Sequence, residues 1–214
     1  MLITFEGVDG CGKSTQVRLL DERLNRAGAK AVVVREPGGT ELSEAIRELL
    51  LRPTLAVSPT AELLLFSAAR AQLVTEVIRP ALEAGRVVIC DRFTDSTLAY
   101  QGGGRVLADP SWIRGLNGRA TGGLIPARTY YLAVEPAVAR SRATTGEDRM
   151  EAAGEEFYAR VVRAYEQLAD REPERVTRLD GTAAVEDIHE RIWTDIVELL
   201  GRPELAETGS TGGT

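Results

Sequence analysis

The residues most clearly suited to chemistry lie near the amino terminus, in the segment 7-GVDGCGKST-15. The segment fits the phosphate-loop pattern G-x-x-x-x-G-K-[ST] at every fixed position. Its glycines allow backbone N–H groups to converge on an anion, and the helix that follows adds the positive end of its dipole. Lys13 is then expected to reach the β- and γ-phosphates of a nucleotide, and Ser14 to offer its hydroxyl group to Mg²⁺. The loop predicts a bound nucleotide without saying which reaction follows.

A carboxylate at the end of a neighbouring strand is the second part that such a site needs. The segment 87-VVICD-91 supplies one, since its apolar run leads directly into Asp91. An aspartate in this place can hold a metal-bound water beside the nucleotide. Ser14 and Asp91 are therefore the predicted metal-binding residues. By itself, an apolar run followed by Asp indicates only the end of a strand.

Strand-like apolar runs alternate with helical patterns along the chain, and these elements have to position the loop. The expected strands are 2–5, 31–34, 87–90, 129–134 and 176–179. The expected helices include 14–27, 41–51, 61–84, 154–172 and 185–200, with Pro80 kinking the last turns of the third. This alternation predicts an α/β fold in which helices cover both faces of a parallel sheet.

The bulk composition narrows the possible functions. With 214 residues, 43% of them apolar and 27% charged, the chain suits one domain, or one domain with a mobile insert. A formal net charge of −6 argues against a nucleic-acid-binding surface. The sequence shows neither a long apolar run nor a signal peptide, so we expect no membrane span and a cytoplasmic location. Cys11, Cys90 and His189 are too few for a zinc site or a histidine-based triad.

Five segments together carry a resemblance to a known family: 6-EGVDGCGKST-15, 35-REPGGTELSEAIRELLL-51, 63-LLLFSAARAQLV-74, 91-DRFTDSTLAYQGGGR-105 and 148-DRMEAAGEEFYARV-161. The sequence resembles the bacterial thymidylate kinases, which are P-loop nucleoside monophosphate kinases, over about residues 2–200. The resemblance implies a three-layer P-loop NTPase fold with a five-stranded parallel sheet, a single domain over 1–200, and a short arginine-rich lid at about 140–152. The polar, glycine-rich segment 201–214 is expected to be disordered.

The resemblance also implies a reaction, in which the γ-phosphoryl group of the co-substrate ATP passes to dTMP. The products are dTDP and ADP, for dTTP synthesis. An anionic phosphate oxygen as acceptor needs no general base, which agrees with a chain whose only histidine lies far from every motif. Two polyanions must meet in line, so catalysis consists mainly of positioning and charge neutralisation by lysine, arginine and Mg²⁺. A homodimer is implied as well.

The acceptor base is assigned to one helix face. Phe66 and Arg70 are four residues apart, so they lie on the same side of a helix. The resemblance implies that Phe66 stacks on thymine and that Arg70 hydrogen-bonds the carbonyl edge of the base. Spacing alone fits Phe66 equally well as a core residue. Arg70 opposes that interpretation, because a charge on an apolar face needs a partner.

The acceptor phosphate and sugar are assigned to other residues. Arg47 and Arg92 match family arginines that grip the dTMP phosphate, although spacing alone also fits Arg47 on a solvated helix face. Asp9 is implied to contact the sugar 3′-hydroxyl, and Tyr100 to exclude a ribose 2′-hydroxyl. Residues 102–104 are three glycines, expected to let the backbone approach the ligand, although composition alone fits a plain flexible loop equally well. The full set implied for dTMP is Asp9, Glu36, Pro37, Arg47, Phe66, Arg70, Arg92, Ser96, Thr97, Tyr100 and Gln101.

The lid segment 140-RSRATTGEDR-149 is expected to bring positive charge to the donor. Gly10 and Cys11 stand where some relatives carry an arginine in the phosphate loop, so the lid has to supply it. Arg149 is the best match, followed by Arg142 and Arg140, and the sequence leaves open which one contacts the transferred phosphoryl group. Charge alone also fits a solvated loop. The implied catalytic residues are Lys13, Arg92, Arg142 and Arg149, and the implied ATP-binding residues are Gly7, Val8, Asp9, Gly10, Cys11, Gly12, Lys13, Ser14, Thr15, Arg140 and Thr182.

Two other function classes compete with this interpretation. A deoxynucleoside kinase would need a carboxylate base such as Glu36, but a neutral nucleoside offers no phosphate to Arg47 and Arg92. A non-catalytic nucleotide switch would need a guanine-reading motif such as N-K-x-D, which the sequence lacks. Cys11 and Cys90 are interpreted as packing residues, with redox sensitivity of the site as the alternative.

Overall fold

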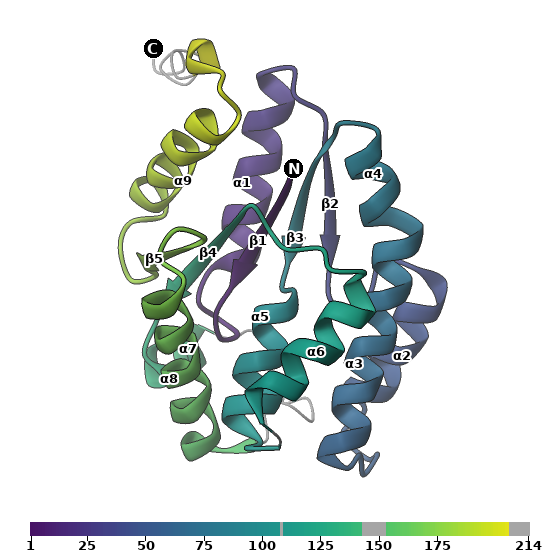
Figure 1. The fold of residues 1–214 in the computed structure, drawn as a ribbon. Coiled ribbons are helices and arrows are strands. Elements are labelled where there is room, and N and C mark those ends of the chain that lie inside the picture. Colours follow the sequence, from purple (N-terminus) through teal and green to yellow (C-terminus); the bar gives the residue numbers. More distant parts are fainter. Residues whose placement is uncertain (108, 143–152, 206–214) are drawn as a thin grey trace.

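A parallel sheet of five strands forms the centre of the molecule (Figure 1). The computed structural model describes residues 1–107, 109–142 and 153–205. The strands are β1 (Leu2–Glu6), β2 (Ala31–Arg35), β3 (Val87–Asp91), β4 (Arg128–Ala133) and β5 (Val176–Asp180), each within two residues of its predicted bounds. Their order is β2-β3-β1-β4-β5, and every neighbouring pair is parallel. The predicted α/β fold with a five-stranded parallel sheet is therefore confirmed.

Helices connect the strands and cover both faces of the sheet (Figure 1). The described helices are α1 (Lys13–Arg26), α2 (Glu41–Leu51), α3 (Pro59–Leu73), α4 (Arg79–Glu83), α5 (Thr94–Thr97), α6 (Pro110–Thr121), α7 (Pro136–Arg142), α8 (Glu155–Arg171) and α9 (Val185–Leu199). Two π-helical segments, η1 (Val74–Ile78) and η2 (Leu98–Gly104), continue α3 and α5. The layers follow from the parallel strands, because each crossover has to return over one face of the sheet.

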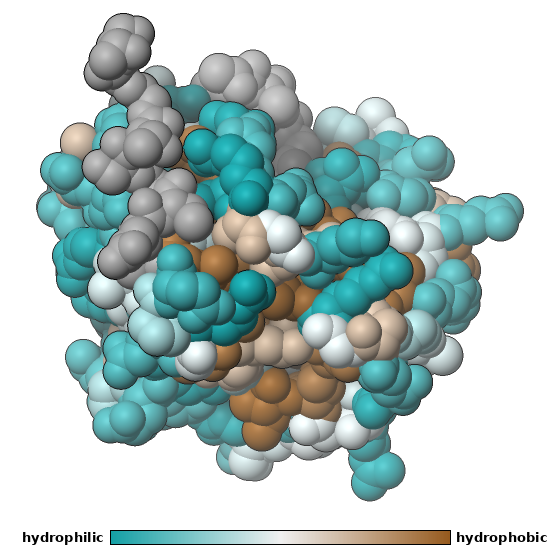
Figure 2. Space-filling model, turned by 90° about the horizontal axis from the view of Figure 1, so that it is seen from above, coloured by the Kyte–Doolittle hydropathy of each residue, from teal (hydrophilic) through white to brown (hydrophobic). Residues whose placement is uncertain are grey.

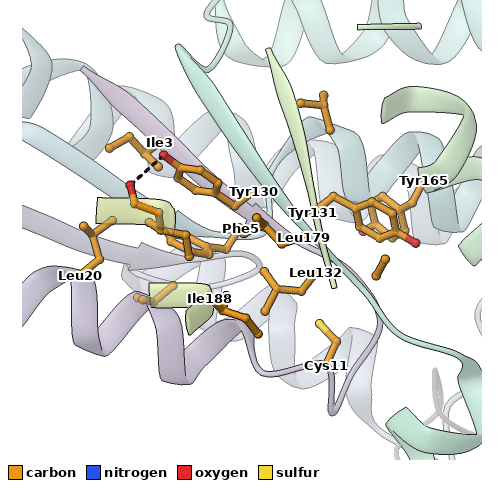
Figure 3. Close-up of a cluster of buried hydrophobic side chains, with 14 of the residues drawn as sticks. Ile3, Phe5, Cys11, Leu20, Tyr130, Tyr131, Leu132, Tyr165, Leu179 and Ile188 are labelled. Atoms are coloured by element: carbon orange, nitrogen blue, oxygen red, sulfur yellow. Dashed lines mark hydrogen bonds between the residues drawn. The ribbon is translucent and has the colours of Figure 1, made fainter. Parts of the chain in front are cut away.

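Alternation along the strands divides the core between the two faces. Ile3 and Phe5 of β1 pack in one cluster with the buried side chains of α1 and α9. Leu2 packs in another cluster with α3, η1 and α4. Tyr130 and Tyr131 of β4 likewise point to opposite sides, as Figure 3 shows. The Tyr130 ring lies 5.4 Å from Phe5, and Tyr131 stacks on Tyr165 of α8 at 5.0 Å.

The prediction of one uninterrupted helix over 61–84 is wrong in where the helix starts and in its continuity. The structure starts this element at Pro59, where the Ser58 side chain accepts a hydrogen bond from the Ala61 amide. It then passes from α3 through η1 into α4. Pro80 lies in the first turn of α4, where a missing N–H group disturbs little, and the change in helical hydrogen bonding occurs before it, at η1.

The carboxyl-terminal segment also differs from expectation at its start. Residues 201–205 form a turn, and Leu205 is 3% exposed and packs into the core cluster. Burial of this leucine stabilises the ordered position of the segment. The remaining residues for which disorder was predicted, 206–214, lie outside the described part of the chain.

Figure 2 shows the molecule from above the view of Figure 1, which is the end at which the strands begin. Hydrophilic residues dominate its rim, and hydrophobic residues show near its centre. In the part of the chain that the structure describes, no helix combines the length and the apolar character needed to cross a membrane.

Candidate active site

The carboxyl ends of the central strands bring the predicted residues together (Figure 1). The phosphate loop, residues 7–15, connects β1 to α1, and Asp91 ends the neighbouring strand β3. In open parallel sheets, ligands bind in the crevice beyond these strand ends. The fold thus explains why segments far apart in the sequence meet at one edge.

The amino terminus of α1 has N–H groups that no side chain caps, and these can bind an anion. Gly12 precedes the helix with a φ of 100°, a left-handed conformation that favours glycine. No side chain caps α1, and its first turn carries no acidic residue. By contrast, Thr40, Ser58 and Asp109 cap the amino termini of α2, α3 and α6 with side-chain oxygens. The first N–H groups of α1 are therefore available to a phosphate.

Lys13 is folded back into the loop. Its Nζ donates hydrogen bonds to the carbonyl oxygens of Gly7 at 3.0 Å and Val8 at 2.8 Å, and only 5% of the residue is exposed. The Sγ atom of Cys11 is 3.6 Å away. A bound phosphate would be a stronger partner for the ammonium group than these carbonyl oxygens, because its hydrogen bonds would join two opposite charges.

Ser14 and Asp91 are directly connected. The Ser14 hydroxyl group donates to Asp91 Oδ2 at 2.8 Å, which joins the start of α1 to the end of β3. Both groups supply the hard oxygen ligands that Mg²⁺ prefers. A cluster of three or more His, Cys, Asp and Glu residues suited to a metal is absent from the described residues. The pair thus fits a cation that is held mainly by water and phosphate oxygens.

Arg92 and Asp9 form the centre of the site. The Arg92 guanidinium group pairs with Asp9 Oδ1 at 2.7 Å and donates to the Gly7 carbonyl oxygen at 2.7 Å. Burial favours the neutral form of Asp9, but Arg92 and Lys13 outweigh it and lower the Asp9 pKa to about 2. Arg92 has a φ of 71°, which is strained for a residue with a Cβ atom and places its backbone at a sharp turn after β3.

A cavity of about 710 Å³ extends over the phosphate loop. It has a polar side formed by the loop and by charged residues, and a less polar side formed by the ends of β4, β5 and α9. Its lining residues are Asp9, Gly10, Cys11, Gly12, Lys13, Ser14, Thr15, Gln16, Arg35, Glu36, Arg47, Asp91, Arg92, Leu132, Arg142, Gly181, Ala183, Val185 and Ile188.

A second, smaller cavity of about 100 Å³ lies beside the first. It combines aromatic and apolar walls with a few polar groups, as expected of a small-molecule site. Its lining residues are Asp9, Glu36, Pro37, Arg47, Leu51, Phe66, Arg70, Arg92, Ser96, Thr97, Tyr100 and Gln101. Asp9, Glu36, Arg47 and Arg92 line both cavities, so two anionic ligands would meet at these residues.

A buried ion pair lines the second cavity. Arg70 is 1% exposed and contacts Glu36 Oε2 at 2.7 Å, from α3 to the segment after β2. Burial raises the pKa of Glu36, and Arg70 opposes that shift. Arg70 also donates to Thr97 Oγ1, Asn117 Oδ1 and the Phe93 carbonyl oxygen, as three further contacts. The peptide bond that joins Glu36 to Pro37 is cis.

Comparison with known proteins identifies the family. A family model described as thymidylate kinase matches residues 5–192. A thymidylate kinase of Bifidobacterium longum (strain DJO10A) is 49% identical over 203 residues, which is 93% of this chain and 98% of the relative. One of Synechococcus sp. (strain JA-3-3Ab) is 52% identical over 194 residues, 91% of this chain and 94% of the relative. The crystal structure of thymidylate kinase from Ehrlichia chaffeensis is 35% identical, with a TM-score of 0.75 over 92% of this chain and 98% of that chain.

The chain belongs to the thymidylate kinase family. This membership confirms the predicted P-loop NTPase fold and the predicted enzyme class. It does not favour the alternative of a deoxynucleoside kinase.

The residues predicted for the acceptor lie together at the second cavity. Every residue predicted for dTMP binding lines it. Leu51, at the end of α2, lines it too and was not predicted, because an apolar residue at the end of an amphipathic helix carries no distinctive signal. Phe66 lines the cavity and is partly exposed, and it also packs against the core cluster of Ile46, Leu50 and Ala69.

Several residues predicted for ATP do not line the first cavity. Gly7 and Val8 lie beneath it, and their carbonyl oxygens accept hydrogen bonds from Lys13. Thr182 turns away, because its amide and hydroxyl groups both bind Asp180 Oδ1, at 2.9 and 2.6 Å. Arg140 pairs with Glu155 at 3.2 Å instead. These side chains satisfy local partners that the motif does not reveal.

Other lining residues were missed by sequence reasoning. The apolar part of the first cavity uses residues from the ends of β4 and β5 and the start of α9. No motif marks them, since their positions depend on how α9 packs against α1. The missed residues of this apolar part are Leu132, Gly181, Ala183, Val185 and Ile188, and two polar residues, Gln16 of α1 and Arg35 of β2, were missed as well.

The three glycines at 102–104 do not form a loop that approaches a ligand. They belong to η2, which packs closely against α8. A Cβ atom at Gly103 would lie 2.6 Å from Ala164 Cβ, and one at Gly104 would lie 2.5 Å from the Phe157 ring. The expectation was wrong because the missing side chains make room for a neighbouring helix rather than for a ligand.

The lid is described only at its edges. Arg142 ends α7, lines the first cavity and donates to the Gly181 carbonyl oxygen at 2.7 Å. Arg149 and residues 143–152 lie outside the described part of the chain. Arg142 is therefore the lid arginine that the described structure brings to the nucleotide cavity.

Proposed function

We propose that this protein transfers the γ-phosphoryl group of ATP to the 5′-phosphate of dTMP, giving dTDP and ADP. The observation that carries the proposal is the junction of the two cavities at Asp9, Arg47 and Arg92. One cavity contains the phosphate loop, and the other has the size and walls for a nucleoside monophosphate base. A donor and an acceptor phosphate bound in this way face each other across the shared residues.

Positive charge on both sides of the junction neutralises the meeting phosphates. Lys13 and the amino terminus of α1 serve the donor, with Arg142 approaching from α7. Arg47 and Arg92 serve the acceptor phosphate. The acceptor oxygen is already anionic, so the transfer needs no residue to remove a proton. Fixed positive groups in this partly enclosed site stabilise charge that moves between the phosphates.

Mg²⁺ is part of the proposal. The Ser14 hydroxyl and the Asp91 carboxylate, 2.8 Å apart, are the groups that would hold it, directly or through water. When bound, the ion neutralises charge on the β- and γ-phosphates of ATP. Asp91 thereby acts as a metal-binding residue, and no carboxylate is assigned the role of a base.

The acceptor nucleoside is assigned to the walls of the second cavity. Phe66 offers an aromatic face to a pyrimidine ring. Arg92, which lines both cavities, has its Cζ atom 5.2 Å from the centre of the Tyr100 ring. Tyr100 is buried, so a bulky substituent on the sugar beside it would collide with its ring. This packing supports a preference for a 2′-deoxyribose. The adenosine part of ATP is assigned to Gly181, Ala183, Val185 and Ile188.

An assay of ADP release across nucleotides tests the proposal. The purified protein is mixed with ATP, Mg²⁺ and, in separate reactions, dTMP, dUMP, dCMP, dGMP or thymidine. We expect dTMP to give the highest kcat/KM, and thymidine to give no turnover. Turnover of thymidine in place of dTMP would identify a nucleoside kinase and reject the proposal. Slow ATP hydrolysis that no acceptor accelerates would identify a nucleotide-binding ATPase and reject it as well.

Two further features rest on the resemblance. We expect a homodimer in solution, and a cytoplasmic location. Exposed leucines on α2 and α3, namely Leu42, Leu49 and Leu64, are apolar side chains that a second copy of the chain can cover.

A further inference from the structure

A buried carboxylate outside both cavities has no role in the function described so far. Glu62 lies on α3 and is 0% exposed. Burying a carboxylate is costly unless charged or polar groups compensate it. Here Gln101 Nε2 donates to Glu62 Oε1 at 2.8 Å, and Arg105 donates to both carboxylate oxygens at 3.2 and 3.1 Å. Glu62 therefore connects α3 with η2, the element that carries Gln101.

The contact determines which end of the Gln101 side chain faces the second cavity. An amide group has one donor end and one acceptor end, whereas an ionised carboxylate only accepts hydrogen bonds. Glu62 therefore holds the amide nitrogen, and Arg105 pairs with the same carboxylate and fixes its orientation. Gln101 lines the second cavity, and its carbonyl oxygen is the end that remains for a ligand.

Arg70, the other polar residue expected to contact the nucleotide base, is less available for hydrogen bonds to a ligand. Each of its three side-chain nitrogens already contacts a protein group: Glu36, Thr97, Asn117 or the Phe93 carbonyl oxygen. The side-chain amide oxygen of Gln101, Oε1, accepts no hydrogen bond from the residues that the structure describes, whereas the backbone carbonyl oxygen of Gln101 accepts one from the Leu107 amide. Gln101 is thus better placed than Arg70 to distinguish bases by their donors and acceptors.

The pyrimidines differ at the atom that such an oxygen would read. N3 of thymine and uracil carries a proton, whereas N3 of cytosine carries a lone pair. We propose that Glu62 is a positioning residue that holds the Gln101 carbonyl oxygen toward the acceptor base, and so selects pyrimidines with a proton on N3 over cytosine. The inference rests on the proposed function, in which the second cavity holds the base of the acceptor. An unpaired acceptor facing another acceptor is the kind of mismatch that polar sites reject strongly.

The first test replaces the carboxylate by an amide. In Glu62→Gln, residue 62 has a single side-chain oxygen, and we expect Arg105 to donate to it. The new NH₂ group then faces Gln101, and the Gln101 amide is expected to rotate so that its oxygen accepts from that group instead of facing the cavity. We expect KM for dTMP to rise about tenfold with little change in kcat, because a binding contact is lost. The ratio of kcat/KM for dTMP to that for dCMP is expected to fall at least about tenfold. An unchanged ratio in a folded variant overturns the proposal.

A double-mutant cycle separates positioning from simple stabilisation. Gln101→Leu removes the amide, and we expect it to lower the same dTMP-to-dCMP ratio. Glu62→Gln added to Gln101→Leu is then expected to change the ratio no further, since Glu62 acts through Gln101. If Glu62→Gln lowers the ratio by the same factor in both backgrounds, Glu62 acts by another route and the proposal is wrong.

Glu62→Asp is the second variant, in case the amide variant does not fold. It keeps an acceptor-only carboxylate, so the dTMP-to-dCMP ratio is expected to stay near that of the unaltered protein even if the thermal unfolding midpoint falls. A ratio that falls together with the midpoint indicates a purely structural role and overturns the proposal. The unaltered protein is assayed in parallel: if it phosphorylates no dTMP, the proposed function fails, which is a different outcome from a failure of the role of Glu62.

Discussion

At the scale of single residues, the site depends on where positive charge is placed in a chain with a formal net charge of −6. Arg92 shows how specific that placement is. It lines both cavities, pairs with Asp9, and adopts a left-handed backbone conformation at the end of β3. The strain is tolerated because the Arg92 amide donates to the Phe5 carbonyl oxygen and its side chain binds the phosphate loop.

The lid arginines differ in their surroundings, and this leads to the first prediction. Arg142 lines the nucleotide cavity, whereas Arg140 is paired with Glu155 at the surface. We expect Arg142→Ala to lower kcat about 100-fold, because the variant lacks a positive charge that stabilises the phosphoryl group during transfer. Arg140→Ala is the matched comparison and is expected to lower kcat much less. Steady-state kinetics with saturating ATP and dTMP measures both variants.

Equal losses in the two variants would contradict the assignment of Arg142. A small loss in both would instead direct attention to Arg149, the arginine that sequence reasoning ranked first. Circular dichroism and thermal unfolding of each variant show whether a loss arises from changed folding rather than from changed charge.

At the scale of elements, the packing of η2 against α8 determines where the acceptor residues lie. Tyr100 and Gln101 belong to η2, and both line the second cavity. Gly103 makes the close approach possible, because a side chain there would meet Ala164 Cβ at 2.6 Å and the Arg160 carbonyl oxygen at 3.3 Å. The acceptor cavity therefore depends on a helix contact some distance from the ligand.

The second prediction tests this contact. Gly103→Ala is expected to reduce the free energy of unfolding by about 1–3 kcal/mol, because the backbones of η2 and α8 have to move apart. The same shift is expected to raise KM for dTMP more than KM for ATP. Gly115→Ala is the matched control. A Cβ atom at Gly115 on α6 meets no atom within 4 Å, and the change is expected to stabilise the helix by about 0.5–1 kcal/mol. Urea unfolding and steady-state kinetics provide the measurements.

At the scale of the whole molecule, a buried carboxylate at the carboxyl end of the central strand β1 makes the free energy of unfolding depend on pH. Glu6 ends β1 and accepts hydrogen bonds from the Phe93 amide, Ser96 Oγ and Tyr165 OH. Burial raises its pKa to about 7, with Asp95 adding to the shift and Ser96 opposing it. The folded protein therefore binds this proton more tightly than the unfolded chain, whose Glu6 has a pKa near 4.5.

The third prediction gives the sign of this effect. A raised carboxyl pKa contributes stability that is fully present below pH 4.5 and is lost as the pH rises through about 7. We expect Glu6 to make the unfolding free energy fall with pH across this window, by on the order of 3 kcal/mol. Glu6→Gln removes the titration, so its unfolding free energy is expected to change less over the same range. Urea unfolding of both proteins at several pH values measures the difference, and parallel curves would contradict the assignment to Glu6.

The fourth prediction concerns assembly. We expect light scattering to give about twice the 23.2 kDa mass of one chain. Leu42 and Leu49 lie seven residues apart on α2, on the same side, and are 48% and 38% exposed. Changing both to Glu is expected to weaken a dimer that covers them, whereas Ile125→Glu, at an exposed residue before β4, serves as the control. A monomeric mass for the unaltered protein rejects the homodimer.

Much of the fold and of the acceptor site follows from the sequence, for a local reason. Strand runs and helix periods report burial directly, so all five strands were predicted within two residues. The phosphate loop works through a short stretch of backbone, and the acceptor residues were implied by a family resemblance that a few contiguous motifs carry. The sequence thus determined the α/β fold, the donor loop and, apart from Leu51, the residues that line the second cavity.

Other features depend on partners that are distant in the chain, and only the tertiary structure decided them. Thr182 turns to Asp180, Arg140 turns to Glu155, and the glycines of η2 make room for α8. The apolar wall of the nucleotide cavity comes from the ends of β4 and β5 and the start of α9, which no motif marks. The same holds for Glu62, whose sequence position suggests nothing beyond a helix residue. Its carboxylate reaches Gln101 because α3 and η2 are packed together. A side-chain hydrogen bond needs its donor and acceptor at the right distance and angle, and only the packing of the two elements brings these groups together.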